Sequence, residues 1–359
     1  MLITFFWIVG ALNFLGGTLF VTSWFFIKKR YTKNGHMKKP VLSKEKKVTV
    51  IIPCREEIDI EKFEKQEFKN YEIIVVVDSE EDAKKIKTSS KKVRIEISEK
   101  IGASGKNSAL LTGLKKAKGE IIVFADADIK PHKKWLYYLV ASLGNISTSY
   151  RWYFSHPLLC VWNSAIAAIF FYKKLNFAWG GSIAIRKEIL ENLKIEKIWK
   201  NEFVDDLTLT REAKKRGYEI EFVPFAMVES KGEEKIFKWM NRQFAWIKQY
   251  FPWLWNIAFF INVGMRVSNI IGIFFLFINP FIAFLLLSPI LFDFIRGWQE
   301  YSIFVKLMEY PKEKFISPIY HIILRPIASF IISYNLISSL FIKEIEWKGK
   351  KYAIPKAFP

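Results

Sequence analysis

Residues 121–128 read Ile-Ile-Val-Phe-Ala-Asp-Ala-Asp, a continuous apolar run that ends in two carboxylates. A short run of this kind is typical of a strand buried on both faces of a parallel sheet. Three further runs of strand character precede it, at residues 48–52, 73–77 and 93–97, and the stretches between them are rich in Lys, Glu and Ala with helical spacing. This alternation predicts an α/β fold built from βαβ units on a largely parallel sheet.

Carboxylates stand at the ends of two of these predicted strands. Asp78 follows the strand at residues 73–77, and Asp126 and Asp128 follow the strand at residues 121–125. Ligands of open α/β sheets bind beyond the carboxyl ends of the strands. Carboxylate oxygens also suit hard cations such as Mg²⁺ and Mn²⁺, which commonly bridge to diphosphate oxygens. The pattern therefore indicates a cation and diphosphate site, with an ordinary Asp-rich turn as the alternative.

Residues 102–107 read Gly-Ala-Ser-Gly-Lys-Asn, which partly resembles a phosphate-binding P-loop. The glycines are too close together for that motif, and Asn107 stands where it requires Ser or Thr. The segment therefore does not predict an ATPase. Lys106 is nevertheless placed just before a predicted helix, where its ammonium group and the helix N-terminus could contact a phosphate.

Two adjacent carboxylates, Asp205 and Asp206, begin a predicted helix that continues to Arg216 and stops at Gly217. Asp is a favoured residue at helix N-termini, so a capping role is one interpretation. Because a cap needs only one carboxylate, the pair also offers a candidate general base.

The composition of the 359-residue chain indicates a mosaic of soluble and membrane-embedded parts. Hydrophobic residues make up 51% and aromatic residues 17%, yet 25% are charged and the formal net charge is +20. This aromatic content excludes a disordered protein, and two cysteines are too few for a disulfide scaffold or a Cys-rich zinc module. The cations flank apolar segments, which favours attraction to anionic lipids and predicts no nucleic-acid partner.

Three apolar regions predict membrane segments at both ends of the chain. Residues 2–27 contain no charged side chain and are followed by a cluster of Lys and Arg, which predicts a crossing with the following domain on the cytoplasmic side. Residues 253–295 are too long for one crossing and predict a hairpin that turns near Asn279 and Pro280. Residues 319–342 form the third candidate.

The number of C-terminal crossings stays open at this point. One crossing before the soluble domain and three after it would place the Lys-rich C-terminal residues outside the cell, although cations prefer the cytoplasmic side. The conflict disappears if one of the C-terminal segments is re-entrant or lies in the membrane interface.

Two other stretches are apolar without predicting a crossing. Residues 154–172 lie inside the soluble domain and carry polar interruptions, which favours a helix buried against the domain or resting on the membrane surface. Between residues 238 and 255, tryptophans are interspersed with Lys and Arg. This pattern favours an interfacial helix that holds the site against lipid headgroups, with an ordinary amphipathic helix packed on the domain as the alternative.

Eight short motifs occur along the sequence in a specific order. They are residues 51–57 (Ile-Ile-Pro-Cys-Arg-Glu-Glu), 76–78 (Val-Val-Asp), 105–107 (Gly-Lys-Asn), 126–128 (Asp-Ala-Asp), 179–186 (Trp-Gly-Gly-Ser-Ile-Ala-Ile-Arg), 205–207 (Asp-Asp-Leu), 242–246 (Arg-Gln-Phe-Ala-Trp) and 346–352 (Glu-Trp-Lys-Gly-Lys-Lys-Tyr). This order resembles family-2 glycosyltransferases with the GT-A fold, and within them the ceramide glucosyltransferase-like membrane enzymes. The resemblance covers residues 45–250 well and the membrane parts by position only.

The resemblance implies roles for individual residues. Asp78 matches the aspartate that contacts the nucleotide base, and Asp128 matches the direct ligand of a Mg²⁺ or Mn²⁺ ion on the nucleotide diphosphate. Asp206 matches the general base that deprotonates the acceptor hydroxyl. The residues that would bind the nucleotide-sugar are Pro53, Glu57, Asp78, Lys106, Asp126, Arg242 and Trp246.

Two departures from the family pattern concern the donor site. Glu56 and Glu57 stand where the family usually has Asn-Glu, and Ala245 occupies the position of the second Arg in the Gln/Arg-X-X-Arg-Trp motif. Since Ala245 cannot pair with a diphosphate, we expect Arg242 alone of this motif to hold the leaving group.

The predicted organisation is a transmembrane helix at residues 1–30, a cytoplasmic GT-A domain at 45–250, a transmembrane region at 251–345 and a basic tail at 346–359. The predicted function is metal-dependent, inverting transfer of a hexose from a nucleotide diphosphate sugar, expected to be a UDP-sugar, to a lipid hydroxyl at the cytoplasmic membrane face. One alternative is a polysaccharide synthase, for which three or four membrane segments are few. The other is an inactive membrane scaffold, supported by Ala245 and opposed by the intact carboxylates.

Overall fold

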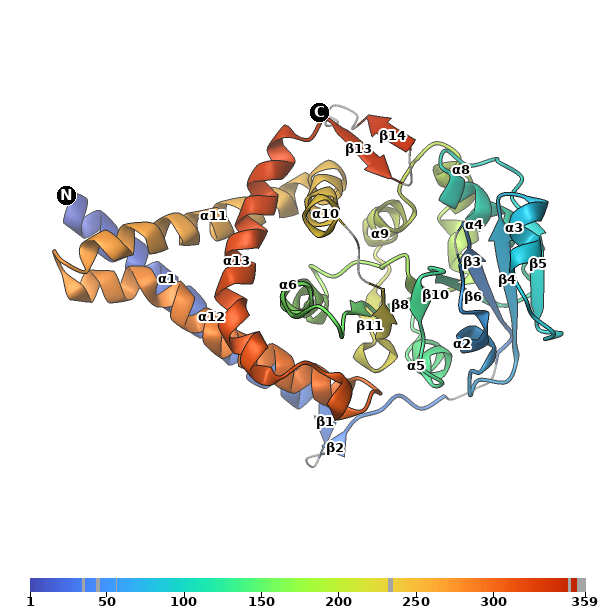
Figure 1. The fold of residues 1–359 in the computed structure, drawn as a ribbon, viewed down its shortest axis with the longest axis horizontal. Coiled ribbons are helices and arrows are strands. Elements are labelled where there is room, and N and C mark those ends of the chain that lie inside the picture. Colours follow the sequence, from blue (N-terminus) through green and yellow to red (C-terminus); the bar gives the residue numbers. More distant parts are fainter. Residues whose placement is uncertain (34–35, 43–45, 56, 232–234, 348–349, 354–359) are drawn as a thin grey trace.

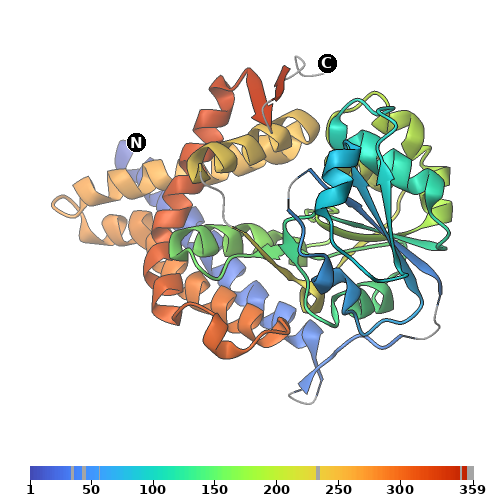
Figure 2. The ribbon, with the colours of Figure 1, turned by 45° about the vertical axis from the view of Figure 1, so that its right-hand side comes forward.

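The computed structural model describes residues 1–33, 36–42, 46–55, 57–231, 235–347 and 350–353. An α/β domain stands beside a group of long helices, and the N-terminus lies at the end of these helices far from the domain (Figures 1 and 2). Glu56, and residues 348–349 and 354–359 of the predicted basic tail, lie outside the described residues.

The domain is organised around one seven-stranded sheet. β5, β4, β3 and β6 run parallel to one another, whereas β10 is antiparallel to both β6 and β8. Val50 pairs with Ile73 on one side and with Val123 on the other. In sheet order the strands are β11 (Ile220–Phe222), β8 (Ile146–Thr148), β10 (Ser182–Arg186), β6 (Ile121–Ala125), β3 (Val48–Pro53), β4 (Tyr71–Val77) and β5 (Val93–Ile97). The four predicted strands and the mostly parallel GT-A sheet are confirmed.

Shorter elements complete the domain around this sheet. The helices are α2 (Ile60–Glu64), α3 (Glu80–Lys85), α4 (Gly105–Lys116), α5 (Trp135–Ala141), α6 (Pro157–Ala167), α7 (Lys187–Asn192), α8 (Ile195–Trp199), α9 (Asp205–Lys215) and α10 (Ile236–Tyr250). Three short strands, β7 (Ile129–Lys130), β12 (Val228–Ser230) and β9 (Arg151–Trp152), form a second sheet. The pairs β1 (Thr32–Lys33) with β2 (His36–Met37), and β13 (Glu344–Trp347) with β14 (Lys350–Ala353), lie outside both.

The side chains of β3 alternate between two cores. Ile51 joins the smaller core, which includes residues of α4, α8 and α9. Val50 and Ile52 join a larger core that continues without interruption to Phe244 of α10 and Leu336 of α13. The α/β domain and the long helices therefore share apolar packing, and this continuity determines how the helices stand against the site.

Four helices are long and apolar enough to cross a membrane, judged by length and composition: α1 (Leu2–Tyr31), α11 (Pro252–Phe275), α12 (Pro280–Leu307) and α13 (Pro318–Phe341). The predicted apolar helices at both ends of the chain are confirmed. The predicted hairpin is confirmed as well, because Asn279 accepts a hydrogen bond from Ile282 N at 3.1 Å and Pro280 occupies the first turn of α12.

The four long helices do not share one direction. α1, α11 and α12 extend away from the domain, and the α11–α12 turn lies near the N-terminus at their far end (Figures 1 and 2). α13 crosses them on the side of the domain and leads to β13 and β14, which lie near α10 (Figures 1 and 2). The end of the last long helix therefore lies on the same side as the α/β domain.

The apolar stretch at residues 154–172 forms α6, followed by a single 3-10 turn at Ala168–Phe171. α6 is short and mostly buried, and Trp162 Nε1 donates a hydrogen bond to Asn335 Oδ1 of α13 at 3.0 Å. The prediction of a buried helix rather than a crossing is confirmed. Its position against α13 makes it part of the contact between the domain and the long helices.

The tryptophan-rich segment forms α10 and the start of α11. Trp239 and Trp255 are buried inside the protein, whereas Trp253 is 52% exposed. α10 therefore packs with one side against the domain and α13, as the amphipathic alternative expected. Its predicted location at a membrane interface remains a prediction.

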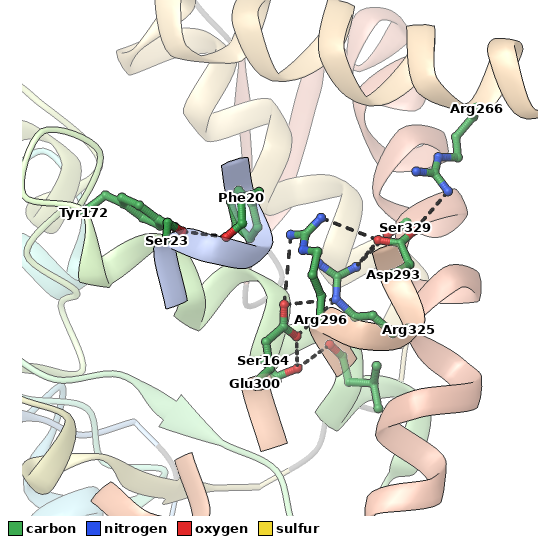
Figure 3. A network of polar contacts seen from close by, with 11 residues as sticks. Phe20, Ser23, Ser164, Tyr172, Arg266, Asp293, Arg296, Glu300, Arg325 and Ser329 are labelled. Carbon is green, nitrogen blue, oxygen red and sulfur yellow. Dashed lines mark hydrogen bonds and ion pairs between the residues drawn. The ribbon is translucent and has the colours of Figure 1, made fainter. Parts of the chain in front are cut away.

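Five charged side chains are enclosed among the long helices (Figure 3). Arg266 Nη1 lies 3.0 Å from Asp293 Oδ2, and Arg325 Nε lies 3.1 Å from Glu300 Oε1. Arg296 Nη1 lies 3.5 Å from Asp293 Oδ1. Asp293 and Glu300 are 1% and 0% exposed, so these five residues, named here the charged cluster, tie α11, α12 and α13 together inside the apolar packing.

Candidate active site

A cavity of about 210 Å³ opens beyond the carboxyl ends of β3, β4 and β6. It is named here the charged cleft. All nine residues predicted for the donor, metal and catalytic sites line it, namely Pro53, Glu57, Asp78, Lys106, Asp126, Asp128, Asp206, Arg242 and Trp246. Residues far apart in the sequence thus meet at the edge of the sheet where ligands of α/β folds bind.

Asp78, the residue expected to contact the nucleotide base, already has a cationic partner. Its carboxylate accepts a hydrogen bond from Nε of Arg55, and both side chains are about one-third exposed at the cleft. Arg55 follows β3 directly and was not predicted as a site residue, although it lies within the first motif of the sequence. The pair positions the Asp78 carboxylate at the cleft.

Lys106 holds two carboxylates together inside the cleft. It lies in the first turn of α4, where Ser104 caps the helix by accepting a hydrogen bond from Asn107 N. The Lys106 ammonium lies 2.8 Å from Asp126 Oδ1 and 3.1 Å from Asp205 Oδ2. Burial alone would lower the pKa of Lys106, but the neighbouring carboxylates outweigh burial and hold that pKa above its usual range.

Asp206 has the features of a general base. Its Oδ2 accepts a hydrogen bond from Gly180 N at 3.0 Å, and its Oδ1 accepts one from Leu207 N at 2.7 Å. Burial, followed by the nearby Asp205 charge, raises the pKa of Asp206 to about 6, against the lowering effect of Lys106. A carboxylate with a pKa near 6 is ionised at neutral pH and is a stronger base than an ordinary Asp.

The capping interpretation of this Asp pair does not hold in the structure. Val204 occupies the N-cap position of α9, and the helix has no side-chain cap. Both carboxylates instead turn toward Gly180, where an added Cβ would lie 2.7 Å from Asp205 Oδ2 and 3.0 Å from Lys106 Nζ. A glycine at this position therefore allows the charged side chains to approach the backbone.

α10 contributes Arg242 and Trp246 to the cleft. Ala245, which replaces an Arg of the family motif, is 1% exposed and does not line the cleft. The side chain at this position therefore packs inside the protein rather than toward the donor site.

A second, smaller cavity of about 70 Å³ adjoins the cleft and is named here the apolar pocket. Asp206, Arg151 and Trp246 line both cavities. The remaining wall is mostly apolar and comes from α6, α9, α10 and the segment before β10, with Trp162, Ile166, Phe177, Leu207, Phe244 and Ile247. The candidate base thus stands between a charged cavity and an apolar one.

Two models of known protein families match the chain. Residues 160–357, more than half of its length, match the family model described as glycosyl transferase family 21, and residues 49–193 match glycosyl transferase family 2. The chain belongs to glycosyl transferase family 21. No curated protein matches it.

Solved structures similar to this family 21 glycosyltransferase are distant in sequence. The mannosyltransferase PcManGT from Pyrobaculum calidifontis, in complex with GDP-Man and Mn2+, is 16% identical over 93% of this chain and 99% of that chain, with a TM-score of 0.49. Glucosyl-3-phosphoglycerate synthase from Mycobacterium tuberculosis is 18% identical over 57% of this chain and 77% of that chain, with a TM-score of 0.39.

The charge balance of the cleft in this glycosyltransferase fits a divalent cation. Six carboxylates and four cationic side chains line it, which leaves an excess of two negative charges. Among the described residues, no group of three His, Cys, Asp or Glu side chains could hold a metal by itself. Asp128 would therefore be one protein ligand among diphosphate and water oxygens, which is the usual way that Mg²⁺ binds with nucleotides.

Several residues that line the charged cleft were not predicted from the sequence. Arg151, Trp179, Phe203 and Gln243 all line the charged cleft. Trp179 belongs to a motif quoted from the sequence and Gln243 to the α10 motif, so both had a detectable signal. Arg151 has none, because it lies on the two-residue strand β9 outside any recognised pattern.

Proposed function

We propose that this glycosyltransferase moves a hexose from a nucleotide diphosphate sugar, expected to be a UDP-sugar, to the hydroxyl of a membrane lipid, with inversion at the anomeric carbon. The observation that carries the proposal is the position of Asp206. Asp206 lines both the charged cleft, suited to a nucleotide diphosphate, and the apolar pocket, suited to an aliphatic acceptor.

In the proposed donor complex, Asp78 contacts the nucleotide base and Arg242 and Lys106 face the diphosphate. Lys106 remains charged, so it can neutralise phosphate oxygens while it stays close to Asp126. A Mg²⁺ or Mn²⁺ ion at Asp128 would add positive charge to the diphosphate and make it a better leaving group.

Asp206 performs the proton transfer in this proposal. It accepts the proton of the acceptor hydroxyl, whose oxygen forms a bond to the anomeric carbon as the bond from that carbon to the diphosphate oxygen breaks. The electron pair of the broken bond stays on the diphosphate. Because the acceptor oxygen and the leaving group occupy opposite faces of the sugar, one displacement inverts the anomeric centre and needs no enzyme nucleophile.

The walls of the apolar pocket support a lipid acceptor. Trp162 and Ile166 of α6 and Phe244 and Ile247 of α10 offer no charge to a polar sugar acceptor, but they suit the first methylene groups of a lipid alcohol. Both helices contact α13, whose exposed side carries Ile323, Phe330 and other large apolar residues. A lipid could therefore reach Asp206 along apolar surface.

The proposed membrane arrangement follows from the directions of the helices. α1, α11 and α12 cross the membrane, and α13 lies along its cytoplasmic surface with the domain beside it. Basic residues at the domain end of α1, Lys28, Lys29 and Arg30, support this orientation. It also removes the parity conflict, because three crossings keep the C-terminal segment on the cytoplasmic side.

The proposal is tested with purified full-length protein, a panel of sugar nucleotides and total membrane lipid, with Mn²⁺, Mg²⁺ or a chelator. We expect nucleotide diphosphate release with one donor, label in the lipid fraction, and loss of both in chelator. Full activity in chelator would contradict the role of Asp128. A polymeric product would instead support a polysaccharide synthase, and no release with any donor would support an inactive scaffold.

A further inference from the structure

Arg151 is enclosed by aromatic rings at the boundary between the charged cleft and the apolar pocket. Its guanidinium carbon lies 4.9 Å from the ring centroids of Trp179 and Trp239 and 5.5 Å from that of Tyr150. The three rings come from different parts of the chain. Ring faces attract a guanidinium by cation–π interaction and leave the N–H groups at its edge available for hydrogen bonds.

The environment keeps Arg151 charged, although no carboxylate forms a direct ion pair with it among the described residues. Burial alone would lower the pKa of Arg151, but the nearby tyrosines, Asp128 and Asp126 outweigh burial and raise that pKa above its usual range. Within the described part of the chain Arg151 has no ion pair, and its buried Nε has no hydrogen-bond partner. The buried Arg266 and Arg325, in contrast, each have a carboxylate within 3.1 Å.

A half-buried guanidinium with no direct ion pair can accept the negative charge of a bound ligand. The charged cleft is where that ligand would bind, because Arg151 lines it together with Asp126, Asp128 and Arg242. Arg242 is the cation that the α10 motif presents there, and Ala245 of the same motif points into the protein interior. Arg151 adds a further cation to Lys106 and Arg242 on the wall of the cleft that would face a diphosphate.

We propose that Arg151 is a further catalytic residue, which contacts the diphosphate leaving group and stabilises the negative charge that develops on it. This inference rests on the proposed function. As the bond from the anomeric carbon to the diphosphate oxygen breaks, its electron pair passes to that oxygen, and the guanidinium edge donates hydrogen bonds to the phosphate. The proton of the acceptor goes to Asp206, so the charges balance without another reactant.

The proposal predicts that Arg151 distinguishes nucleoside diphosphates from monophosphates. We would measure the binding of UDP, UMP, GDP and GMP to the full-length protein in detergent with Mn²⁺, for wild type and Arg151→Met. The dissociation constant of the diphosphate should rise at least tenfold, while that of the monophosphate changes less than twofold. The kcat of transfer should fall more than the KM for the donor rises.

Two further variants keep this test decisive. Arg151→Lys preserves a charge but not the planar fork, so it should lose threefold to tenfold in diphosphate affinity even where Arg151→Met fails to fold. Arg216→Met removes an exposed arginine at the end of α9 and should change neither affinity. Unchanged diphosphate affinity in both Arg151 variants, or equal losses for diphosphate and monophosphate, would overturn the proposal.

The outcome also separates this inference from the proposed function. A wild-type protein that binds none of the four nucleotides contradicts the donor site itself. A wild-type protein that binds a diphosphate tightly, with no selective loss in the Arg151 variants, contradicts only the role of Arg151.

Discussion

The charged cleft and the charged cluster both hold carboxylates against buried cations, but they differ in balance and in space. The cleft has six carboxylates against four cations around a cavity of about 210 Å³. The cluster has three arginines against two carboxylates, and these carboxylates, Asp293 and Glu300, are 1% and 0% exposed (Figure 3). The same kinds of ion pair therefore serve two different purposes.

Each carboxylate of the cluster is held by partners on other helices. Glu300 accepts hydrogen bonds from Arg325 of α13 at 3.1 Å and from Ser164 of α6 at 2.9 Å, and Arg325 also donates one to Ser329 at 2.6 Å. No substrate is needed to complete these contacts. In the cleft, by contrast, Lys106 stands between carboxylates next to open space, so an incoming phosphate or cation can redistribute its contacts. Unbalanced charge beside a cavity, rather than buried charge alone, therefore distinguishes the candidate active site from a structural cluster.

The largest expected effect comes from a substitution in the charged cleft that leaves the charged cluster unchanged. Asp206→Asn removes the proton acceptor while its amide can still occupy the same space, so kcat should fall about 10²- to 10⁴-fold. Diphosphate affinity and the thermal unfolding midpoint should change little. Steady-state kinetics and nucleotide titration measure the two quantities.

Asp82→Asn, at a partly exposed position on α3 outside the charged cleft, is the matched control and should retain full activity. Unchanged turnover in Asp206→Asn would show that another group accepts the proton.

The second-largest expected effect comes from a substitution in the charged cluster that leaves the charged cleft unchanged. Arg325→Met leaves Glu300 buried without its main partner, and removing one member of a buried pair costs about 3–5 kcal/mol in the free energy of unfolding. Thermal and denaturant unfolding in detergent measure this loss. Protein that remains folded should bind nucleotide with unchanged affinity.

Replacing both partners, Arg325→Met with Glu300→Met, should restore much of the lost stability, because no buried charge is then left alone. A single Arg325→Met variant as stable as wild type would contradict a structural role for the cluster.

The smallest effect concerns the pH dependence of the cleft. Because the pKa of Asp206 is raised to about 6, activity should fall about tenfold per pH unit below pH 6 and level off above pH 7. The pKa of Asp206 in the folded protein lies above the ordinary value of an Asp, so the folded protein binds the proton more tightly, and stability should decrease slightly as pH rises from about 4 to 6.

Lys106→Gln removes a charge that lowers the pKa of Asp206. The acid limb of its pH–rate profile should therefore move to higher pH, at whatever activity remains. A limb that stays in place or moves to lower pH would exclude Asp206 as the titrating group.

The positions of the carboxylates at the strand ends could be predicted from the sequence because they depend on local pattern. Asp78 and Asp126 follow continuous apolar strands, and parallel strands place their carboxyl ends at one edge of a sheet. The role of Asp206 came from the family resemblance, and its raised pKa comes from burial and from Asp205, with Lys106 acting in the opposite direction. The positions of these carboxylates could therefore be predicted from the sequence, whereas the electrostatic environment that sets the pKa of Asp206 could not.

Arg151 and the charged cluster could not be predicted in the same way. Trp179 and Trp239, which surround Arg151, come from distant segments, so no spacing in the sequence signals the site. Arg266 and Asp293 lie within the apolar stretch at residues 253–295, and hydropathy records their charges but not which helices meet. Their pairing depends on how α11 and α12 pack.

The amino-acid order alone established the strands, the long apolar helices and the carboxylates at the strand ends, because these follow from side-chain periodicity and from the short range of backbone hydrogen bonding. Packing between distant elements decided the rest. It turned α13 across the other helices, placed Asp206 between a charged and an apolar cavity, and left Arg151 enclosed by rings without a carboxylate partner in the described residues. Burial and charge at a site are sums over neighbours from the whole fold, so they exist only once the chain is packed.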